Sequence, residues 1–447
     1  MAAKKKLILN LFGGLGGFHM GAWRSPGRDG DLRQTFELFK WQAQAAERGH
    51  MHALFLADRL WVSPELGDAP AHSVQHPMDP VSLLSALSMC TEHIGLIGTR
   101  ATTYGQPYNL AREFATLDEI SGGRAAWNVV TGGGAEAPNF GLDAPPEHDV
   151  RYEVAEEFVD AVKGLWDSWD DDAFLYDKQG GHYWDGDKVH TLDFVGKHVK
   201  VRGPLLVRRP PQGHPPLVQA GTSPAGMELG GRIGDMIFDL STTVEKNRDT
   251  RRRFREIAAS NGRDPEHLKY IPDLHMLIAP TQAEADDRLG RLEERVDPTV
   301  ALPQLSQILG IDVSSMDLDG RLPADIPLTS GYQSWQQRYI AMADRENLTI
   351  RQLARRAVQF PSQVVAGTAE SIADRMQECL DGEAADGFMC RPALLDTVTD
   401  IVDSLIPELQ RRGIFRTGYE GTTLRENLGL PRPAGRYESV RTVPQPA

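Results

Sequence analysis

The stretch Ser121–Gly134, SGGRAAWNVVTGGG, contains the polar residues that most directly suggest a ligand site. It opens with a turn, runs through an apolar segment that favours a β-strand, and ends on Asn128, Thr131 and three glycines. Buried strands are continuous hydrophobic runs, so polar side chains mark the point where a strand surfaces. A strand with a polar, glycine-rich end is typical of the C-terminal mouth of a parallel barrel, where ligands bind.

A second candidate is the loop Gly221–Gly226, GTSPAG, which leads from a strand into a helix expected to begin near Met227. Free backbone N–H groups at a helix start, with hydroxyls beside them, can hold a phosphate without a basic residue. The alternative is that Thr222 or Ser223 only caps the helix. We favour the phosphate, because small residues are more numerous here than a cap requires. A serine-hydrolase elbow needs G-x-S-x-G, which this loop does not match.

Other polar residues are ambiguous on their own. Asp58 follows a buried strand directly, and it either contacts a ligand or braces the next loop, with equal support for both. His148, Arg151 and Tyr152 could hold a phosphate or a substrate acid, although exposed positions at a helix start are the more favoured interpretation.

Two apparent motifs are rejected. The glycines of Gly13–Phe18 follow a strand, but His19 stands where a dinucleotide fingerprint needs its third glycine, and no helix is expected there. His72 and His76 have the i, i+4 spacing of metal ligands on a helix, but they lie in a Pro-flanked polar loop without nearby acids or cysteines. We therefore expect no metal site.

The stretch 121–134 and the loop Gly221–Gly226 can lie close together only if their strands end at the same edge of one sheet. Eight segments are expected as strands, and helical patterns separate most of them, which indicates an α/β fold and a TIM-like (β/α)8 barrel. The eight are 6–12, 52–57, 94–103, a strand within 121–134, 217–220, 235–240, 270–279 and 387–391. Helices are expected at 31–48, 81–91, 110–120, 150–169, 369–380 and 393–412.

The 447 residues are expected to form a single domain, 1–447, with two insertions and a tail. The first insertion, about 170–216, has two short alternating pieces near 188–194 and 198–201 that predict an antiparallel hairpin. The second, about 281–363, is too long for a loop and predicts an inserted helical layer. That this layer acts as a lid is a hypothesis. The tail, 414–447, is expected to wrap the surface or a neighbour.

Composition limits the possible partners. The net charge of −14 argues against nucleic acid and anionic membranes, which both reward clusters of Lys and Arg. No apolar run approaches the roughly 20 residues of a transmembrane helix, and no signal peptide is recognised. Three scattered cysteines are too few for a disulfide framework, so a reducing cytoplasm is expected.

Several motifs together resemble one family. They are SGGRAAWNVVT, NFG at 139–141, H-x-x-RY at 148–152, LWDSW at 165–169, QAGTSPAG and YEGTTLRENLGL at 419–430. The chain is similar over nearly its whole length to the luciferase-like, flavin-dependent monooxygenases. It most resembles the branch with nitrilotriacetate, EDTA, dibenzothiophene-sulfone and long-chain alkane monooxygenases.

The resemblance implies a TIM-like barrel that binds FMNH2 supplied by a separate NAD(P)H:flavin reductase and uses O2 to oxygenate a small organic substrate through a flavin (hydro)peroxide. It implies a homodimer or homotetramer. Phe12 and His19 would face the substrate. The flavin ring and ribityl chain would lie along Asp58, Thr103, Asn128 and Thr131. The FMN phosphate would be held by Tyr152, Gly221, Thr222, Ser223, Ala225 and Gly226.

One departure concerns the end of the opening stretch. The branch usually has a serine after Thr131, where this chain has Gly132, Gly133 and Gly134. The lost hydroxyl is expected to shift flavin or substrate contacts, and the glycines leave room for a bulky substrate. The substrate itself stays open, as do hydroxylation, C–N or C–S cleavage and lactone formation. A deazaflavin (F420)-dependent oxidoreductase, a non-catalytic flavin-binding protein and a metal-dependent barrel hydrolase are the alternatives.

Overall fold

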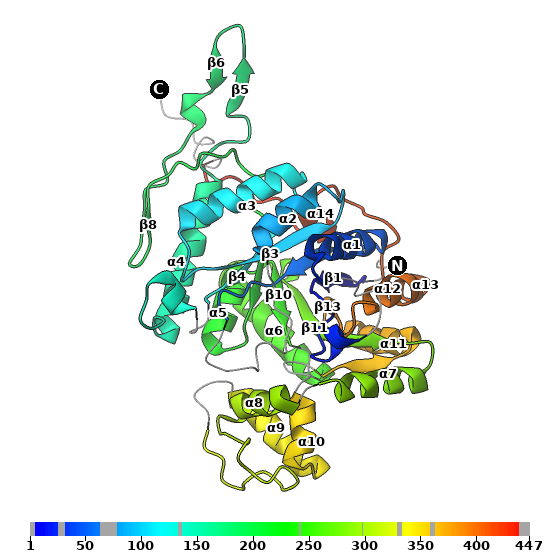
Figure 1. Cartoon of the computed structure of the whole chain (residues 1–447). Helices are drawn as coiled ribbons and strands as arrows, with labels where there is room; N and C mark the ends of the chain where they lie inside the picture. Colours follow the sequence, from blue (N-terminus) through cyan, green and yellow to red (C-terminus); the bar gives the residue numbers. More distant parts are fainter. Residues whose placement is uncertain are drawn as a thin grey trace.

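Eight parallel strands form a closed barrel in the computed structural model, which describes residues 5–25, 32–62, 78–132, 136–240, 243–296, 298–328, 333–357 and 363–437 (Figure 1). Neighbouring strands follow the order β10-β9-β4-β3-β2-β1-β13-β11, and the pairing of β10 with β11 closes the ring. The strands are β1 (Ile8–Phe12), β2 (Ala53–Leu56), β3 (Gly95–Ala101), β4 (Ala125–Val130), β9 (Leu217–Ala220), β10 (Met236–Asp239), β11 (Lys269–Ile278) and β13 (Gly387–Pro392). The expected barrel is confirmed.

Strand periodicity explains which side chains fill the barrel. Successive side chains of a strand point to opposite faces, so Ile8 and Phe12 of β1 point inward while Leu9 and Leu11 pack outward under the helices. Ala53, Phe55, Ile97, Ala126, Val218, Met236, Ile271 and Met389 complete the inner apolar cluster. Both faces are buried, which is why these segments are nearly uninterrupted hydrophobic runs.

Helices cover the outside of the barrel, at α1 (Thr35–Arg48), α2 (Pro80–Ser88), α3 (Pro107–Ser121), α4 (His148–Trp166), α5 (Pro224–Ile233), α6 (Val244–Ser260), α11 (Ala369–Asp381), α12 (Thr397–Asp400) and α13 (Ile406–Arg411). A π-helical turn at Ile401–Leu405 joins the last two, and short 3-10 helices lie at Ala22–Arg24, Ala137–Phe140, Gly186–Lys188 and Pro265–His267. The expected start of α5 near Met227 was wrong. The helix begins at Pro224, because Ser223 caps it and proline suits the first helical position.

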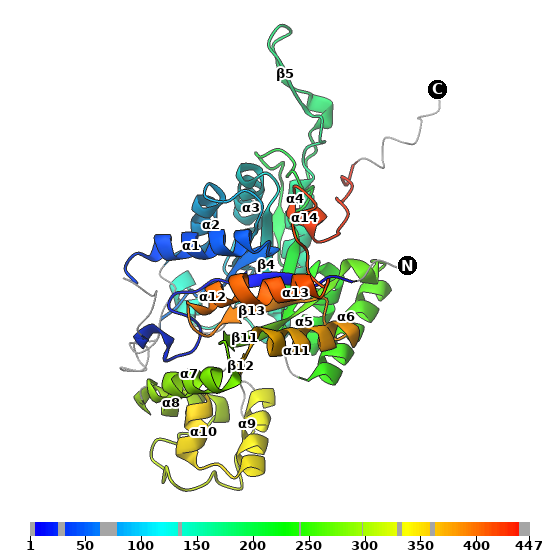
Figure 2. The same cartoon turned by 90° about the vertical axis from the view of Figure 1, so that its right-hand side faces the viewer.

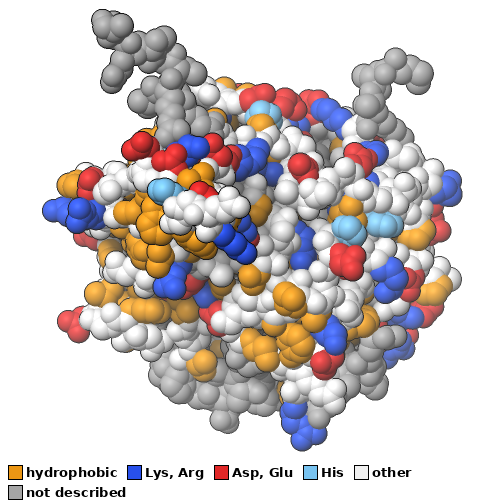
Figure 3. Space-filling view, turned by 90° about the horizontal axis from the view of Figure 1, so that it is seen from above, with side chains coloured by type: hydrophobic (Ala, Val, Ile, Leu, Met, Phe, Trp, Pro, Cys, Tyr) orange, Lys and Arg blue, Asp and Glu red, His pale blue; other side chains and the backbone are white. Residues whose placement is uncertain are grey.

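The first insertion contains two antiparallel hairpins. The expected hairpin is β7 (Phe194–Val195) with β8 (Lys200–Val201). A second one, β5 (Phe174–Asp177) with β6 (His182–Trp184), was not predicted. Figure 2 shows this second hairpin projecting from the barrel. Figure 3, viewed from the hairpin's side of the molecule, shows hydrophobic side chains gathered on one part of the face, and the exposed apolar residues of the hairpin are Leu175, Tyr176, Tyr183 and Trp184.

The second insertion is helical, as expected, with α7 (Gln282–Glu294), α8 (Pro298–Leu309), α9 (Gln333–Glu346) and α10 (Ile350–Ala357). Helices α8, α9 and α10 surround an apolar core of their own, on the opposite side of the molecule from the β5–β6 hairpin (Figure 2). Met20, from the loop after β1, packs against that core. An unpredicted strand, β12 (Val365–Gly367), returns the chain to β11. A lid function and the division into one domain with insertions stay predictions.

The tail closes the N-terminal end of the barrel. Helix α14 (Leu424–Asn427) is fixed by a capping box between Thr423 and Glu426. Leu424, Leu428 and Leu430 join the inner apolar cluster. The chain thus wraps back beneath the strand starts. None of the described helices is long and apolar enough to cross a membrane.

Candidate active site

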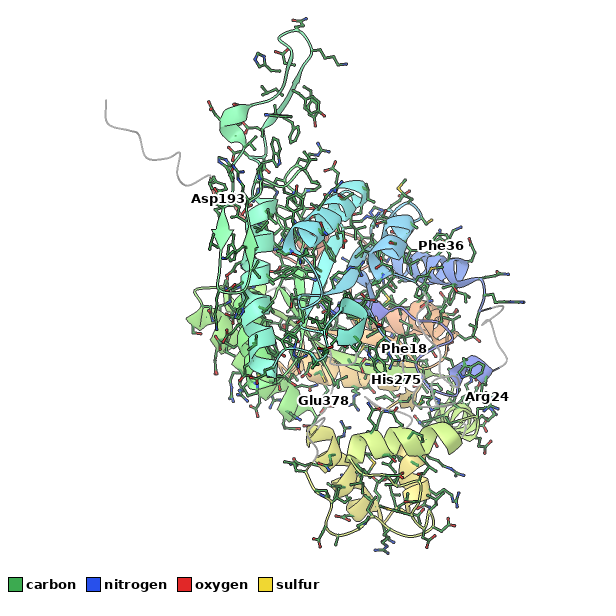
Figure 4. All side chains as sticks on the ribbon, turned by 60° about the vertical axis from the view of Figure 1, so that its left-hand side comes forward. Phe18, Arg24, Phe36, Asp193, His275 and Glu378 are labelled. Atoms are coloured by element: carbon green, nitrogen blue, oxygen red, sulfur yellow. The ribbon has the colours of Figure 1, made fainter. Side chains whose placement is uncertain are left out.

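Aromatic rings line the inside of the barrel near the strand ends. The ring of Phe12 lies 4.7 Å from that of Phe18, 4.8 Å from Phe55 and 6.0 Å from Phe238, measured between centroids. Phe18 comes from the loop after β1, and its backbone N–H donates to the carbonyl of Pro392 at the end of β13. Figure 4 labels Phe18 and His275 in this part of the molecule. The cluster gives the predicted substrate side an apolar wall.

His19 is buried beside this wall, with 2% of its surface exposed. Its Nδ1 accepts the backbone N–H of Gly21 at 3.1 Å, so the neutral ring carries its proton on Nε2. Burial lowers the pKa of His19 to about 4. At neutral pH, His19 therefore offers one N–H donor, and Nε2 has no hydrogen-bond partner among the described residues.

The lowered pKa makes stability depend on pH. The ordinary histidine pKa is 6.5, so the unfolded chain takes up this proton first as the pH falls. The stabilisation is complete above about pH 6.5 and is lost as the pH falls towards 4. Between about pH 7.5 and about pH 5, the wild type should lose about 2 kcal/mol more unfolding free energy than His19→Gln. Urea unfolding at both pH values measures this, and equal losses in the two proteins would contradict it.

The ends of β2, β3 and β4 bring the predicted ring-side residues together. Asn128 Nδ2 donates to Thr99 Oγ1 at 2.9 Å, and that hydroxyl donates to the carbonyl of Leu56 at 2.8 Å. Thr103 Oγ1 donates to the carbonyl of Thr131 at 2.5 Å. Asn128 is 3% exposed, and its Oδ1 has no hydrogen-bond partner in the described part of the chain. A buried amide oxygen in that state needs a ligand or water donor.

Asp58 has an ion-pair partner. Its Oδ2 lies 3.1 Å from Nη1 of Arg100, which also binds Asp79 and Glu113. Burial raises the pKa of Asp58, and the Arg100 cation opposes that shift. This arrangement matches the bracing interpretation, in which Asp58 holds the loop after β2. Its expected contact with the flavin stays a prediction.

The predicted phosphate loop lies between β9 and α5. Ser223 Oγ accepts the N–H of Gly226 at 3.1 Å and lies 3.5 Å from Tyr152 Oη of α4. A Cβ on Gly226 would lie 3.1 Å from that phenol oxygen, 3.1 Å from Ser223 Oγ and 3.1 Å from the carbonyl oxygen of Gly221. Glycine therefore keeps a small polar cradle open at the start of a helix, where the helix dipole favours an anion.

The backbone at Gly132 explains why this chain has a glycine after Thr131, where the related branch usually has a serine. Its φ is +83°, a conformation that disfavours side chains, and a Cβ would meet the ring of Tyr104 at 2.7 Å. A serine here would be strained and would push Tyr104 away from its stacking partner Phe140. Arg151 Nη1 donates to the Gly132 carbonyl, so Arg151 fixes this turn. Gly133 and Gly134 lie outside the described residues.

Sequence reasoning missed several polar residues inside the barrel. Asp273 and His275 lie two residues apart on the inner face of β11, and Arg391 is the last residue of β13 on that same face. The usable signal was polar side chains two residues apart within a buried strand, which places them on one face. The candidate metal ligands His72 and His76 lie outside the described residues. In the rest of the chain that is described, no group of three or more His, Cys, Asp or Glu is placed to hold a metal ion.

Comparison with known proteins identifies the family. The pattern of the luciferase-like monooxygenases matches residues 15–386. The chain belongs to this family. Nitrilotriacetate monooxygenase component A of Aminobacter aminovorans is 42% identical over 445 residues, covering 97% of this chain and 98% of that protein. N-acetyl-S-(2-succino)cysteine monooxygenase of Bacillus subtilis (strain 168) is 42% identical over 444 residues, covering 98% and 100%. The predicted resemblance is confirmed, and this luciferase-like protein is a monooxygenase.

Among solved structures, riboflavin lyase with modified FMN and riboflavin superposes on this luciferase-like monooxygenase with a TM-score of 0.84 and 32% identity, covering 97% of this chain and 98% of that one. The residues present here fit an FMN. The small cradle at Gly226 suits a phosphate, and the open amide oxygen of Asn128 suits a polar ring edge. Phe12 and Phe55 supply apolar contacts nearby.

Proposed function

We propose that this protein is the oxygenase component of a two-component system, which takes FMNH2 from a separate NAD(P)H:flavin reductase and uses O2 to oxygenate a small organic substrate. The observation that carries the proposal is the small polar cradle formed by Tyr152, Ser223 and Gly226 at the start of α5, together with unsatisfied polar groups at the neighbouring strand ends. The family membership and the modified FMN in a similar structure support the same cofactor. When bound, reduced flavin supplies the electrons that activate O2.

The chain's own residues bind and orient the cofactor and the substrate, and they exclude water from the site. The phosphate is held by Tyr152, Thr222, Ser223 and the backbone N–H groups of the Gly221–Gly226 loop, except at Pro224, which has no N–H, and at Gly226, whose N–H is donated to Ser223 Oγ. Thr103, Asn128 and Thr131 lie along the rest of the cofactor. Phe12 and its neighbouring rings keep water from the reacting centre. His19 presents an uncharged N–H donor to the substrate side. We assign the helices of the second insertion as the lid, since they pack on the loop that carries His19.

The assembly and compartment follow from the same proposal. Cys90, Cys379 and Cys390 are free thiols, which suits a reducing cytoplasm. The family resemblance implies a homodimer or homotetramer, and light scattering of the purified protein tests this.

The decisive experiment is a stopped-flow oxidation. The protein is titrated with FMN, reduced anaerobically and mixed with O2, and the return of oxidised-flavin absorbance is compared with that of free FMNH2. We expect reoxidation to be slower on the protein, because the site shields the flavin. If FMNH2 does not bind, the proposal fails and F420-dependent hydride transfer becomes the better assignment. Stoichiometric binding with no substrate oxygenated would instead identify a flavin carrier.

A further inference from the structure

A buried ion pair lies inside the barrel, next to the aromatic cluster. Arg391 Nη2 of β13 lies 3.1 Å from Asp273 Oδ2 of β11, and the two side chains are 7% and 0% exposed. Burying two charges costs several kcal/mol per ion, so an apolar pair of similar volume would stabilise the barrel at least as well. Stability therefore gives no reason for this pair, and its position suits a ligand contact instead.

The Arg391 guanidinium has donors to spare. Asp273 contacts Nη2, whereas Nε is buried and has no hydrogen-bond partner in the described ranges. A guanidinium carries five N–H donors in a planar fork that matches a carboxylate. Its central carbon lies 5.4 Å from the Phe12 ring centroid and 5.7 Å from that of Phe18. The two rings face the cation and keep water away from it, which strengthens any ionic contact made there.

The surrounding groups belong to the predicted substrate side. Two backbone hydrogen bonds hold the loop after β1 against the end of β13. Phe18 N–H donates to the Pro392 carbonyl, and His19 N–H donates to the Ala393 carbonyl. The same loop thus brings the open Nε2–H of His19 to the strand end that carries Arg391. The charged Arg391 guanidinium and the neutral His19 N–H donor therefore both belong to the substrate side of the barrel.

We propose that Arg391 binds a carboxylate group of the substrate, so that the substrates of this enzyme are organic carboxylates. The inference rests on the proposed function, since it places the substrate at Phe12 and His19. Asp273 holds the guanidinium in position and neutralises it before substrate binds. A carboxylate adds one negative charge beside Asp273, whereas a phosphate dianion would add two, so the site selects the carboxylate.

Binding is measured by the rise in melting temperature of the FMN-loaded protein and of the flavin-free protein. The probes are succinate, benzoate and nitrilotriacetate, each compared with its neutral amide. A ligand that binds only the folded state raises the melting temperature according to its affinity. We expect at least one of these carboxylates to bind tenfold or more tightly than its amide. If none of the three carboxylates binds more tightly than its amide, the proposal is overturned.

Variants test whether the preference for a carboxylate over its amide depends on the Arg391 guanidinium. Arg391→Met leaves Asp273 buried without this cation and can fail to fold, so Arg391→Met/Asp273→Asn serves beside it as a neutral pair. We expect the double variant to lose the tenfold preference and to keep wild-type FMN affinity. Asp273→Asn alone should bind the carboxylate more tightly, because it frees Nη2, whereas a merely structural pair predicts no gain.

Two further results separate this inference from the proposed function. A carboxylate preference that survives in the double variant would overturn the role of Arg391, even if FMN oxidation proceeds as expected. Conversely, a protein that fails to bind FMNH2 but still shows an Arg391-dependent carboxylate preference would refute the monooxygenase cofactor and keep the anion site. The binding assay needs no turnover, so the two failures are distinguishable.

Discussion

Ser223→Asp is expected to weaken FMN binding about a thousandfold while leaving the fold intact. The new carboxylate would stand at the cradle, next to a phosphate of the same sign. Two like charges about 4 Å apart repel by about 4 kcal/mol at an effective dielectric constant near 20, and about 1.4 kcal/mol corresponds to a factor of ten. Aspartate caps a helix as well as serine does, so α5 keeps its N-terminal hydrogen bond. Fluorescence titration with FMN measures the loss.

Riboflavin provides the matched control, because it lacks the phosphate. Its affinity should change less than about threefold in Ser223→Asp, and Ser223→Thr, which keeps the hydroxyl, should bind FMN nearly as the wild type does. Equal weakening of FMN and riboflavin would indicate a general distortion of the loop. Unchanged FMN affinity in the aspartate variant would show that the phosphate lies elsewhere.

Arg124→Met should destabilise the protein by about 4 kcal/mol, since each buried acceptor left unsatisfied costs about 1–3 kcal/mol and part of that is recovered by relaxation. Arg124 is 3% exposed and ends the turn before β4. Its guanidinium makes five hydrogen bonds, all 2.8–3.0 Å long, to Ser121 O, Thr91 Oγ1, Ile94 O, Ser88 O and Thr91 O. Methionine fills similar volume but donates none of them. Urea unfolding measures the change.

Arg202→Met is the control for losing an arginine. Arg202 has 85% of its side chain exposed, and its Nε lies 3.9 Å from Asp193 Oδ1, which is too far for a strong ion pair, so its removal should change stability by less than about 0.5 kcal/mol. Arg124→Lys should fall between, since one ammonium group cannot reach all the acceptors. If Arg124→Met unfolds at the wild-type urea concentration, the arginine of the SGGR motif is not the structural tie that its contacts indicate.

The parts of this fold that were predictable are those where burial leaves a simple pattern. Strands buried on both faces are apolar runs, so Leu217–Ala220 was located with its true bounds and Lys6–Phe12 within two residues. The loop after β9 stood out because hydroxyls and glycines rarely cluster by chance between two apolar elements. The distance between Tyr152 and Ser223 was not predictable, since it depends on how α4 packs against α5.

The unpredicted parts involve contacts between distant segments or two exposed faces. The β5–β6 hairpin packs on no core with either face along most of its length, so its residues carry no inside–outside alternation to detect. Arg391 stands alone at the end of a short strand, and its partner Asp273 comes more than a hundred residues earlier. Only the closed ring of strands makes them neighbours.

The tail beneath the barrel also sets the order in which the protein can be completed during synthesis. Ile8 pairs with Gly387, so the first strand waits for almost the whole chain before its second neighbour exists. The inner apolar cluster then stays open from below until Leu424, Leu428 and Leu430 have left the ribosome. A nascent chain of this protein therefore has to keep a half-built hydrophobic ring from aggregating for most of its translation. Chaperone demand and sensitivity to premature stop codons near residue 420 follow from that single feature of the architecture.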